Sequence, residues 1–192
     1  MILYLHGFRS SPLSFKARLL RQRLETLGQA DRYLCPQLPA SPEQAVALAQ
    51  QLVQGIAPSQ LSLIGSSLGG YYATWLAEKL GCRAVLLNPA VSAPADLEPY
   101  VGVLPAWHSD EPFEFKREYV DQLHALAVPA ITRPERYFLV AATGDEVLDW
   151  RQMVAHYPAA RQRIIEGSDH GLSDFAQYMD EVLAFCGIAV PS

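Results

Sequence analysis

Residues 61–69 read LSLIGSSLG, and this stretch decides the fold. Its first half, 61–65, is a short apolar run of the kind that forms a buried strand. A helical pattern of apolar residues begins at Leu68 and ends before Gly81, a common helix stop. Between the two lies a G-x-S-x-G pattern, residues 65–69, at the junction of strand and helix. The sequence therefore predicts a sharp strand-to-helix turn that carries Ser67.

Apolar runs and helical patterns alternate along the rest of the chain. Strands are expected at 1–5, 32–36, 61–65, 83–87, 137–142 and 161–166, and helices at 16–27, 43–56, 68–80, 150–156 and 175–185. Ser41 and Pro42 are typical of the cap and first turn of the second helix. Because strands that alternate with helices pair in parallel, we expect an α/β fold with a central, mostly parallel sheet flanked by helices.

The regular alternation breaks between residues 88 and 134. Seven of the 14 prolines fall there, around one helical pattern at about 114–126. We expect a proline-rich excursion from the sheet before strand 137–142. Its aromatic residues either line an acyl pocket or form a small core of their own: Trp107, Phe113, Phe115 and Tyr119. With 192 residues, half of them hydrophobic, the chain is expected to form a single domain over 1–192.

Composition excludes several classes of protein. A net charge of -5 offers no basic surface, so nucleic acid is not an expected partner. The three cysteines (Cys35, Cys82 and Cys186) lack disulfide or C-x-x-C spacing and are expected to be small buried apolar residues. The first residues lack the basic flank and length of a signal peptide, and no apolar run reaches the length of a membrane span. A cytoplasmic protein is the resulting expectation.

Three residues of the chain, each near the end of a predicted strand, fit nucleophilic catalysis. A serine hydroxyl such as that of Ser67 is a weak nucleophile without a base, and the base needs an acid to orient it. Among five histidines, only His170 follows a strand through a short turn. Asp145 follows strand 137–142 in the same manner, and the order Ser-Asp-His is that of enzymes with a G-x-S-x-G turn. Asp149 is the competing acid, although it is also well placed to cap helix 150–156, and Asp169 is expected to be a turn residue.

The turn after the first strand, His6-Gly7-Phe8, supplies a further part of such a site. Acyl transfer needs two donors for the developing oxyanion. The backbone N–H groups of Phe8 and Leu68 are the candidates, with His6 as a buried brace of the loop and Gly7 as part of its turn. Gly65 and Gly69 are expected to let strand and helix approach closely around Ser67.

Phosphate, metal and cofactor chemistry lack their usual patterns. Neither G-x-x-x-x-G-K-[ST] nor G-x-G-x-x-G occurs in the chain, although a glycine-rich strand-to-helix turn can in principle bind phosphate. H-E-x-x-H, paired Cys/His spacing and a calcium-type carboxylate loop are also missing from the sequence. No metal and no cofactor is therefore expected.

Several blocks of the chain resemble the YqiA-like family of small bacterial esterases, within the α/β-hydrolase superfamily. The matching blocks span nearly the whole chain: His6-Gly7-Phe8 with Ser10-Ser11-Pro12, Pro36-Gln37-Leu38-Pro39, GSSLGGYYATWL at 65–76, Asn88-Pro89-Ala90-Val91, TGDEVLD at 143–149, and Ile165-Glu166-Gly167 leading to His170. The resemblance implies a minimal α/β-hydrolase fold that acts on carboxylic esters, with acyl thioesters such as acyl-CoA as a further substrate class. The segment at about 92–132 matches only loosely and is expected to be a lid-like or pocket-forming insertion. Ser168-Asp169 also departs from the family, where a Gly-Asn-like pair is expected.

The residues leave other functions open. A peptidase or a C–C hydrolase would use the same three residues, and a binding protein could keep the fold without catalysis. The expected partner is a small-molecule acyl ester or thioester.

Overall fold

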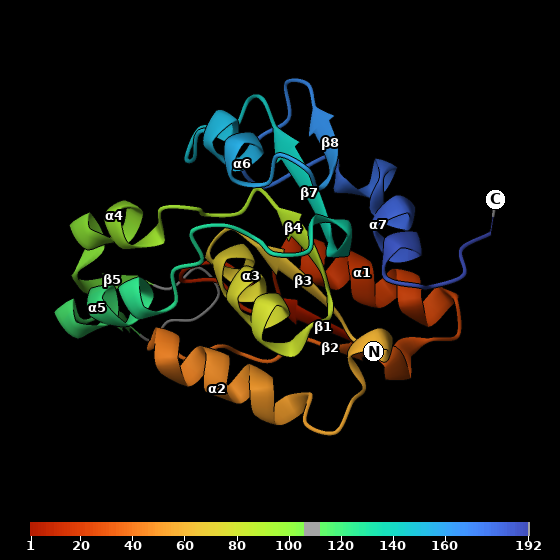
Figure 1. Ribbon diagram of the computed structural model, residues 1–192, viewed down its shortest axis with the longest axis horizontal. Helices are drawn as coiled ribbons and strands as arrows, with labels where there is room; N and C mark the ends of the chain where they lie inside the picture. Colours follow the sequence, from red (N-terminus) through yellow and green to blue (C-terminus); the bar gives the residue numbers. More distant parts are fainter. Residues whose placement is uncertain (106–111, 192) are drawn as a thin grey trace.

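The computed structural model describes residues 1–105 and 112–191. At its centre lies a parallel sheet of order β2-β1-β3-β4-β7-β8 (Figure 1). The strands are β1 Ile2–Leu5, β2 Tyr33–Leu34, β3 Ser62–Ser66, β4 Arg83–Leu87, β7 Tyr137–Ala142 and β8 Arg161–Ile165. Strands β1, β3 and β7 are buried along their whole length, as expected for a parallel sheet covered on both faces.

Helices cover both faces of this sheet (Figure 1). The main helices beside it are α1 Phe15–Thr26, α2 Pro42–Leu52, α3 Leu68–Leu80, α6 Trp150–His156 and α7 Met179–Phe185. Alternate strand residues separate into two cores, with Leu63 facing α2, α3 and α6 and Ile64 facing α1 and α7. Within the described residues, no helix combines the length and apolar character needed to cross a membrane.

The ends of several predicted elements are confirmed at atomic detail. The Ser41 hydroxyl accepts a hydrogen bond from the Gln44 N–H at 3.3 Å, with Pro42 in the first turn of α2. Gly81 ends α3 with φ +75°. Helix α2 is shorter than predicted, because the chain turns at Gly55 with φ +83°. Short 3-10 turns cover Ala30–Arg32, Pro58–Gln60, Glu98–Tyr100, Pro134–Arg136 and Phe175–Gln177.

Two further predicted boundaries were wrong. Strand 32–36 is reduced to β2, because Arg32 closes a 3-10 turn and Pro36 has no N–H to donate. Helix 175–185 begins with a 3-10 turn, in which the Tyr178 N–H bonds to the Phe175 carbonyl, and α7 starts only at Met179.

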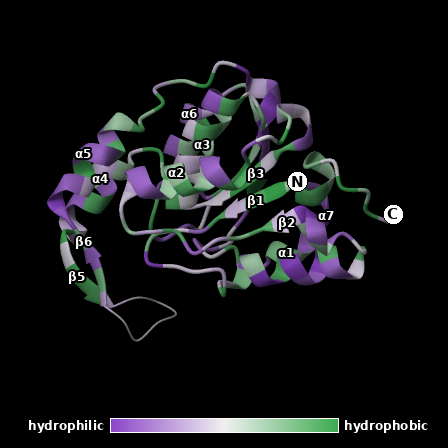
Figure 2. Ribbon diagram, turned by 90° about the horizontal axis from the view of Figure 1, so that it is seen from below, coloured by the Kyte–Doolittle hydropathy of each residue, from purple (hydrophilic) through white to green (hydrophobic). Residues whose placement is uncertain are grey.

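The excursion between β4 and β7 contains more structure than the one helix predicted. It consists of α4 Ala93–Leu97, the antiparallel pair β5 Gly102–Pro105 and β6 Pro112–Phe115, and α5 Arg117–Ala125. Helix α5 starts later than expected because residues 112–115 belong to β6. Figure 2 shows β5 and β6 at the side of the molecule, away from the main sheet. Trp107, a candidate pocket residue, lies outside the described residues.

All three cysteines are free thiols, with Cys82 and Cys186 buried and Cys35 half-buried. This agrees with the prediction of small buried apolar residues for Cys82 and Cys186, whereas Cys35 is only half-buried. Burial raises the pKa of Cys82 to about 11 and that of Cys186 to about 12, so both thiols stay protonated at neutral pH.

Candidate active site

The turn between β3 and α3 holds Ser67 in a strained conformation, with φ +54° and ψ -120°. Three backbone hydrogen bonds fix it there. The Ser67 N–H donates to the Leu87 carbonyl at 3.0 Å, and the Ser67 carbonyl accepts from the amides of Gly70 at 2.9 Å and Ala90 at 3.0 Å. The side chain is therefore presented at the carboxyl end of β3, where ligands bind in open α/β sheets.

Glycines around this turn allow backbone segments to meet. A Cβ on Gly65 would lie 2.2 Å from the Gly69 carbonyl oxygen, and one on Gly69 would lie 1.9 Å from the Leu5 carbonyl oxygen. At Gly70, which the G-x-S-x-G pattern does not include, a Cβ would lie 2.6 Å from the Cβ of Pro89. Helix α3 can therefore lie against β1 and the end of β4 only without side chains at these positions.

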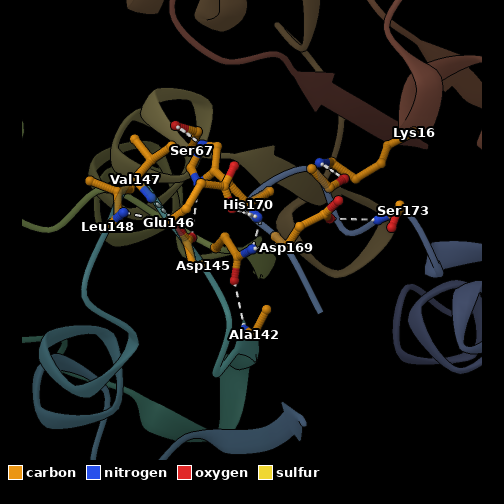
Figure 3. Close-up of polar contacts among 12 residues, drawn as sticks. Lys16, Ser67, Ala142, Asp145, Glu146, Val147, Leu148, Asp169, His170 and Ser173 are labelled. Atoms are coloured by element: carbon orange, nitrogen blue, oxygen red, sulfur yellow. Dashed lines mark hydrogen bonds and ion pairs between the residues drawn. The ribbon is translucent and has the colours of Figure 1, made fainter. Parts of the chain in front are cut away.

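Ser67, His170 and Asp145 form a continuous hydrogen-bonded chain (Figure 3). The Ser67 Oγ lies 3.1 Å from His170 Nε2, and His170 Nδ1 lies 2.8 Å from Asp145 Oδ2. These are the contacts through which an imidazole accepts a proton from a hydroxyl while a carboxylate orients it. The three residues come from the carboxyl ends of β3, β7 and β8, which are non-adjacent in sequence but share one edge of the sheet.

The Asp145 carboxylate is fixed from both sides. Its side chain is 0% exposed, and its second oxygen, Oδ1, accepts hydrogen bonds from the amides of Val147 and Leu148, each at 2.8 Å. The His170 ring is 21% exposed, so the base remains open to solvent and to substrate. The site thus combines a rigid acid with an accessible base.

The two competing aspartates have other partners. Asp149 caps α6 by accepting from the Arg151 N–H at 2.9 Å. Asp169 accepts from the Ser173 N–H at 2.9 Å, and this bond holds the pKa of Asp169 below its usual value. Both positions match the cap and turn interpretations made from the sequence.

The turn after β1 lies directly beside the serine. A Cβ on Gly7 would sit 3.2 Å from Ser67 Cβ, so the backbone that leads into Phe8 passes close to the hydroxyl. Leu68 is the first residue of α3, where an N–H has no partner within the helix. His6 is buried, and its Nε2 accepts from the Leu38 N–H at 3.0 Å. His6 therefore braces the loop against the segment after β2.

Aromatic residues of the excursion pack on this turn. The Phe8 ring meets Phe113 and Phe115 edge-on, each with centroids 5.2 Å apart, and Phe115 also contacts Tyr119. Phe115 is fully buried in the core on the α2, α3 and α6 face of the sheet, and Phe8, Phe113 and Tyr119 pack against that core as partly buried residues. A small pocket lies beside it, lined by Gly7, Phe8, Leu68, Tyr72 and Phe113 among others.

Three polar residues around the histidine were not predicted from the sequence. Glu146 accepts a hydrogen bond from the His170 N–H at 3.0 Å. Asn88, fully buried, donates to the carbonyls of Asp169 and His170. The Lys16 ammonium donates to the Gly171 carbonyl at 2.5 Å. The burial of Lys16 could have been noticed in the sequence, since its spacing from Leu20 and Leu24 places it on the buried face of α1.

The burial of Lys16 makes stability depend on pH. Desolvation lowers the pKa of Lys16 from 10.5 to about 8, against the opposing effect of Asp169 and Asp145. Between these pH values the unfolded chain binds more protons than the folded protein, so stability from this group rises with pH through the window. We expect the free energy of unfolding of the wild type, relative to that of Lys16→Met, to increase by about 3 kcal/mol from pH 8 to pH 10.5.

Urea unfolding of both proteins at several pH values measures this effect. Taking the difference between the two removes the contribution of the buried tyrosines and cysteines, which ionise in the unfolded chain within this window while burial raises their pKa values in the folded protein. A difference that stays flat with pH would show that the Lys16 ammonium is not desolvated.

No group of His, Cys, Asp and Glu suited to hold a metal ion occurs in the part of the chain that the structure describes.

Comparison with known proteins shows which family the chain belongs to. Residues 1–187 match the model of the family described as "Uncharacterised protein family (UPF0227)". The chain belongs to this family. The match covers every strand of the sheet and all three residues of the hydrogen-bonded chain.

Solved structures show which fold the UPF0227 chain adopts. It is similar to mouse alpha/beta hydrolase domain-containing protein 10, with 15% identity and TM-score 0.68 over 95% of this chain and 89% of that chain. The esterase domain of a Rhodothermus marinus protein matches with 22% identity and TM-score 0.65 over 95% and 83%. Est1E from Butyrivibrio proteoclasticus, solved with ferulic acid bound, matches with 14% identity and TM-score 0.62 over 95% and 89%. The chain therefore has the α/β-hydrolase fold that its sequence blocks predict.

Proposed function

We propose that this UPF0227 protein is a serine hydrolase that cleaves carboxylic esters, with acyl thioesters such as acyl-CoA as a further substrate class. The observation that carries the proposal is the hydrogen-bonded chain from the Ser67 hydroxyl through His170 to the buried Asp145 carboxylate. Esterases among the structures of the same fold support the choice of esters.

The proposed reaction begins at Ser67. Its Oγ attacks the acyl carbon as the hydroxyl proton passes to His170 Nε2. The attack converts the acyl group into a tetrahedral oxyanion. Collapse of this intermediate breaks the bond to the leaving alcohol or thiol, which takes the proton from the imidazolium. The products of this half-reaction are the free alcohol or thiol and an acyl ester on Ser67.

Water completes the cycle. His170 removes a proton from a water molecule as its oxygen attacks the acyl-enzyme, and the second tetrahedral intermediate releases the carboxylic acid while the proton returns to Ser67. Asp145 keeps the imidazole in the orientation and tautomer that both halves need. The N–H groups of Leu68 and Phe8 are the proposed oxyanion donors, each contributing on the order of 3 kcal/mol to the transition state.

We propose that the chain forms a single domain over 1–192. Within it, the excursion selects the substrate. Within the described part of the excursion, Phe113 and Phe115 pack on Phe8 beside the proposed oxyanion donor. We propose that this segment forms a wall or lid of the acyl site. The small pocket between Leu68 and Phe113 is its candidate inner end.

Two measurements test the proposed function together. The first is hydrolysis of p-nitrophenyl esters and acyl-CoAs with chains from acetyl to palmitoyl. The second is labelling with a fluorophosphonate, followed by mass spectrometry of the modified peptide. We expect an adduct on Ser67 and ester turnover with a defined chain-length optimum.

Each other result has its own meaning. An adduct on Ser67 without turnover of either series would reject the ester and thioester classes and favour a peptidase or C–C hydrolase on the same residues. If the protein forms no adduct and turns over no substrate, the hydrolase is rejected and a binding protein with this fold is favoured. The Ser66→Ala variant is the matched control, because Ser66 is the neighbouring serine of the same motif and its loss should leave the adduct on Ser67.

A further inference from the structure

Side chains supply several of the hydrogen bonds to the backbone of the loop that carries His170, beside a backbone bond from the Leu172 N–H to the Asp169 carbonyl at 3.1 Å. Residues 166–174 lie between β8 and the 3-10 turn at Phe175–Gln177, outside any strand or helix. The carbonyls of three consecutive residues in this loop each accept a hydrogen bond from a side chain: Asp169 and His170 from Asn88, and Gly171 from Lys16. We call this arrangement the carbonyl cradle.

We propose that Asn88 and Lys16, through the carbonyl cradle, are positioning residues that set His170 at its working distance from Ser67. The inference rests on the proposed function, in which His170 is the base. Neither residue touches the reacting atoms, so neither is a catalytic residue in this scheme. Their effect is expected on the geometry of the base.

Asn88 connects two strand ends to the histidine loop. It follows β4 with φ +43°, and its side chain is fully buried. Its Oδ1 accepts from the Ala142 N–H at 2.8 Å, at the end of β7. Its Nδ2 donates to the carbonyls of Asp169 at 3.0 Å and His170 at 3.1 Å. A single amide thereby joins the ends of β4 and β7 to the histidine loop.

The same residue is also tied to the nucleophile. Ser67 hydrogen-bonds through its backbone to Leu87 and to Ala90, on either side of Asn88. A short, buried path of hydrogen bonds therefore runs from the Ser67 backbone to the His170 backbone. Since both ends are fixed by the same segment, we infer that Asn88 sets the distance between nucleophile and base together with the loop itself.

Lys16 completes the cradle from helix α1 (Figure 3). It lies in the first turn of α1, is 8% exposed, and donates from Nζ to the Gly171 carbonyl. A buried ammonium with a backbone carbonyl as its hydrogen-bond acceptor is costly in an apolar setting, so its loss need not lower stability. Its removal leaves the Gly171 carbonyl without this donor and releases the residue that follows His170.

Small displacements of a base have large effects on rate. A shift of about 1 Å in a reacting group can cost about 10²-fold. We expect Asn88→Ala to lower kcat by about 10²-fold and Lys16→Met by about 10-fold, with KM within about threefold of the wild type in both. Asn88→Asp keeps the size of the side chain but places a carboxylate against two carbonyl oxygens, and it should lower kcat by at least about 10-fold.

Ser62→Ala is the matched control. Ser62 is buried and its hydroxyl donates to the Cys186 carbonyl at 3.4 Å, at the opposite end of β3. This variant also removes a buried side-chain donor from a backbone carbonyl, but far from His170. We expect its kcat to stay within about twofold of the wild type, whatever stability it loses.

A spectroscopic readout tests the cradle independently of activity. The proton on His170 Nδ1, shared with Asp145, gives a downfield proton NMR resonance that reports the position of the ring. We expect this resonance to shift or broaden in Asn88→Ala and in Lys16→Met and to stay in place in Ser62→Ala, all measured on samples whose circular dichroism shows the native fold.

The outcomes separate the two proposals. Unchanged kcat and an unchanged resonance in folded Asn88→Asp and Lys16→Met would overturn the cradle while leaving Ser67-dependent hydrolysis intact. If the wild type neither hydrolyses esters nor forms the fluorophosphonate adduct, the proposed function fails, and the resonance alone then decides whether Asn88 and Lys16 hold the ring. Should Asn88→Ala fail to fold, Lys16→Met and Asn88→Asp carry the test.

Discussion

Replacing Ser67 with alanine is expected to lower kcat for ester hydrolysis by about 10⁵- to 10⁶-fold. The reason is that the variant has no group to form the acyl-enzyme, although its oxyanion donors and substrate pocket remain. A residual rate above that in water is expected for the same reason. Steady-state kinetics with the best p-nitrophenyl ester from the substrate series measures the loss.

The Ser67 and His170 effects should not add. The two side chains are joined by a hydrogen bond of 3.1 Å and act in one step, so removing either disables the same route. His170→Ala and the double variant should therefore be about as slow as Ser67→Ala. A double variant slower than both single variants by the product of their effects would show that serine and histidine act independently, which contradicts the mechanism. Ser62→Ala serves here too as the control for replacing a serine with alanine away from the site.

The proposed catalytic residues were accessible to sequence reasoning because each follows a recognisable strand within a few residues. Ser67, Asp145 and His170 come shortly after β3, β7 and β8, and carboxyl ends of parallel strands share one edge. Local pattern plus one rule of sheet geometry was enough to bring them together. The competing role of Asp149 was also local, since a helix cap is decided within its first turn.

Residues that hold the site from a distance were not accessible in this way. Lys16 contacts Gly171, 155 positions away, and Asn88 contacts His170, 82 positions away. No periodicity in a single sequence specifies such pairs. Asn88 could be noticed only as a polar residue at the end of an apolar strand, and Lys16 only as a charge on an apolar helix face.

The excursion was predicted least well for a related reason. Strands β5 and β6 are short, pair mainly with each other and begin or end at prolines, with Pro105 opposite Pro112. Proline is depleted in strand interiors, so sequence patterns favoured a loop. Their position is decided by the contact of Phe113 and Phe115 with Phe8, which is a tertiary effect.

Gly69→Ala is expected to destabilise the fold by at least about 3 kcal/mol, because the added methyl group overlaps backbone and not a movable side chain. Its Cβ would lie 1.9 Å from the Leu5 carbonyl oxygen and 2.7 Å from that of His6. The only relief is to move α3 away from β1. Urea unfolding followed by circular dichroism measures the loss.

Gly28→Ala separates this overlap from simple backbone strain. Gly28 has φ +66° and nothing within 4 Å of an added Cβ, so its variant bears only the cost of a left-handed conformation, about 1 to 2 kcal/mol. Gly69 has the opposite combination, with overlap and no positive φ. Equal losses in the two variants would show that helix and strand are not in close contact at the turn. The folded fraction of Gly69→Ala should also turn over substrate slowly, because the displaced atoms belong to Leu5 and His6, which lead directly into Gly7 and the proposed oxyanion donor at Phe8.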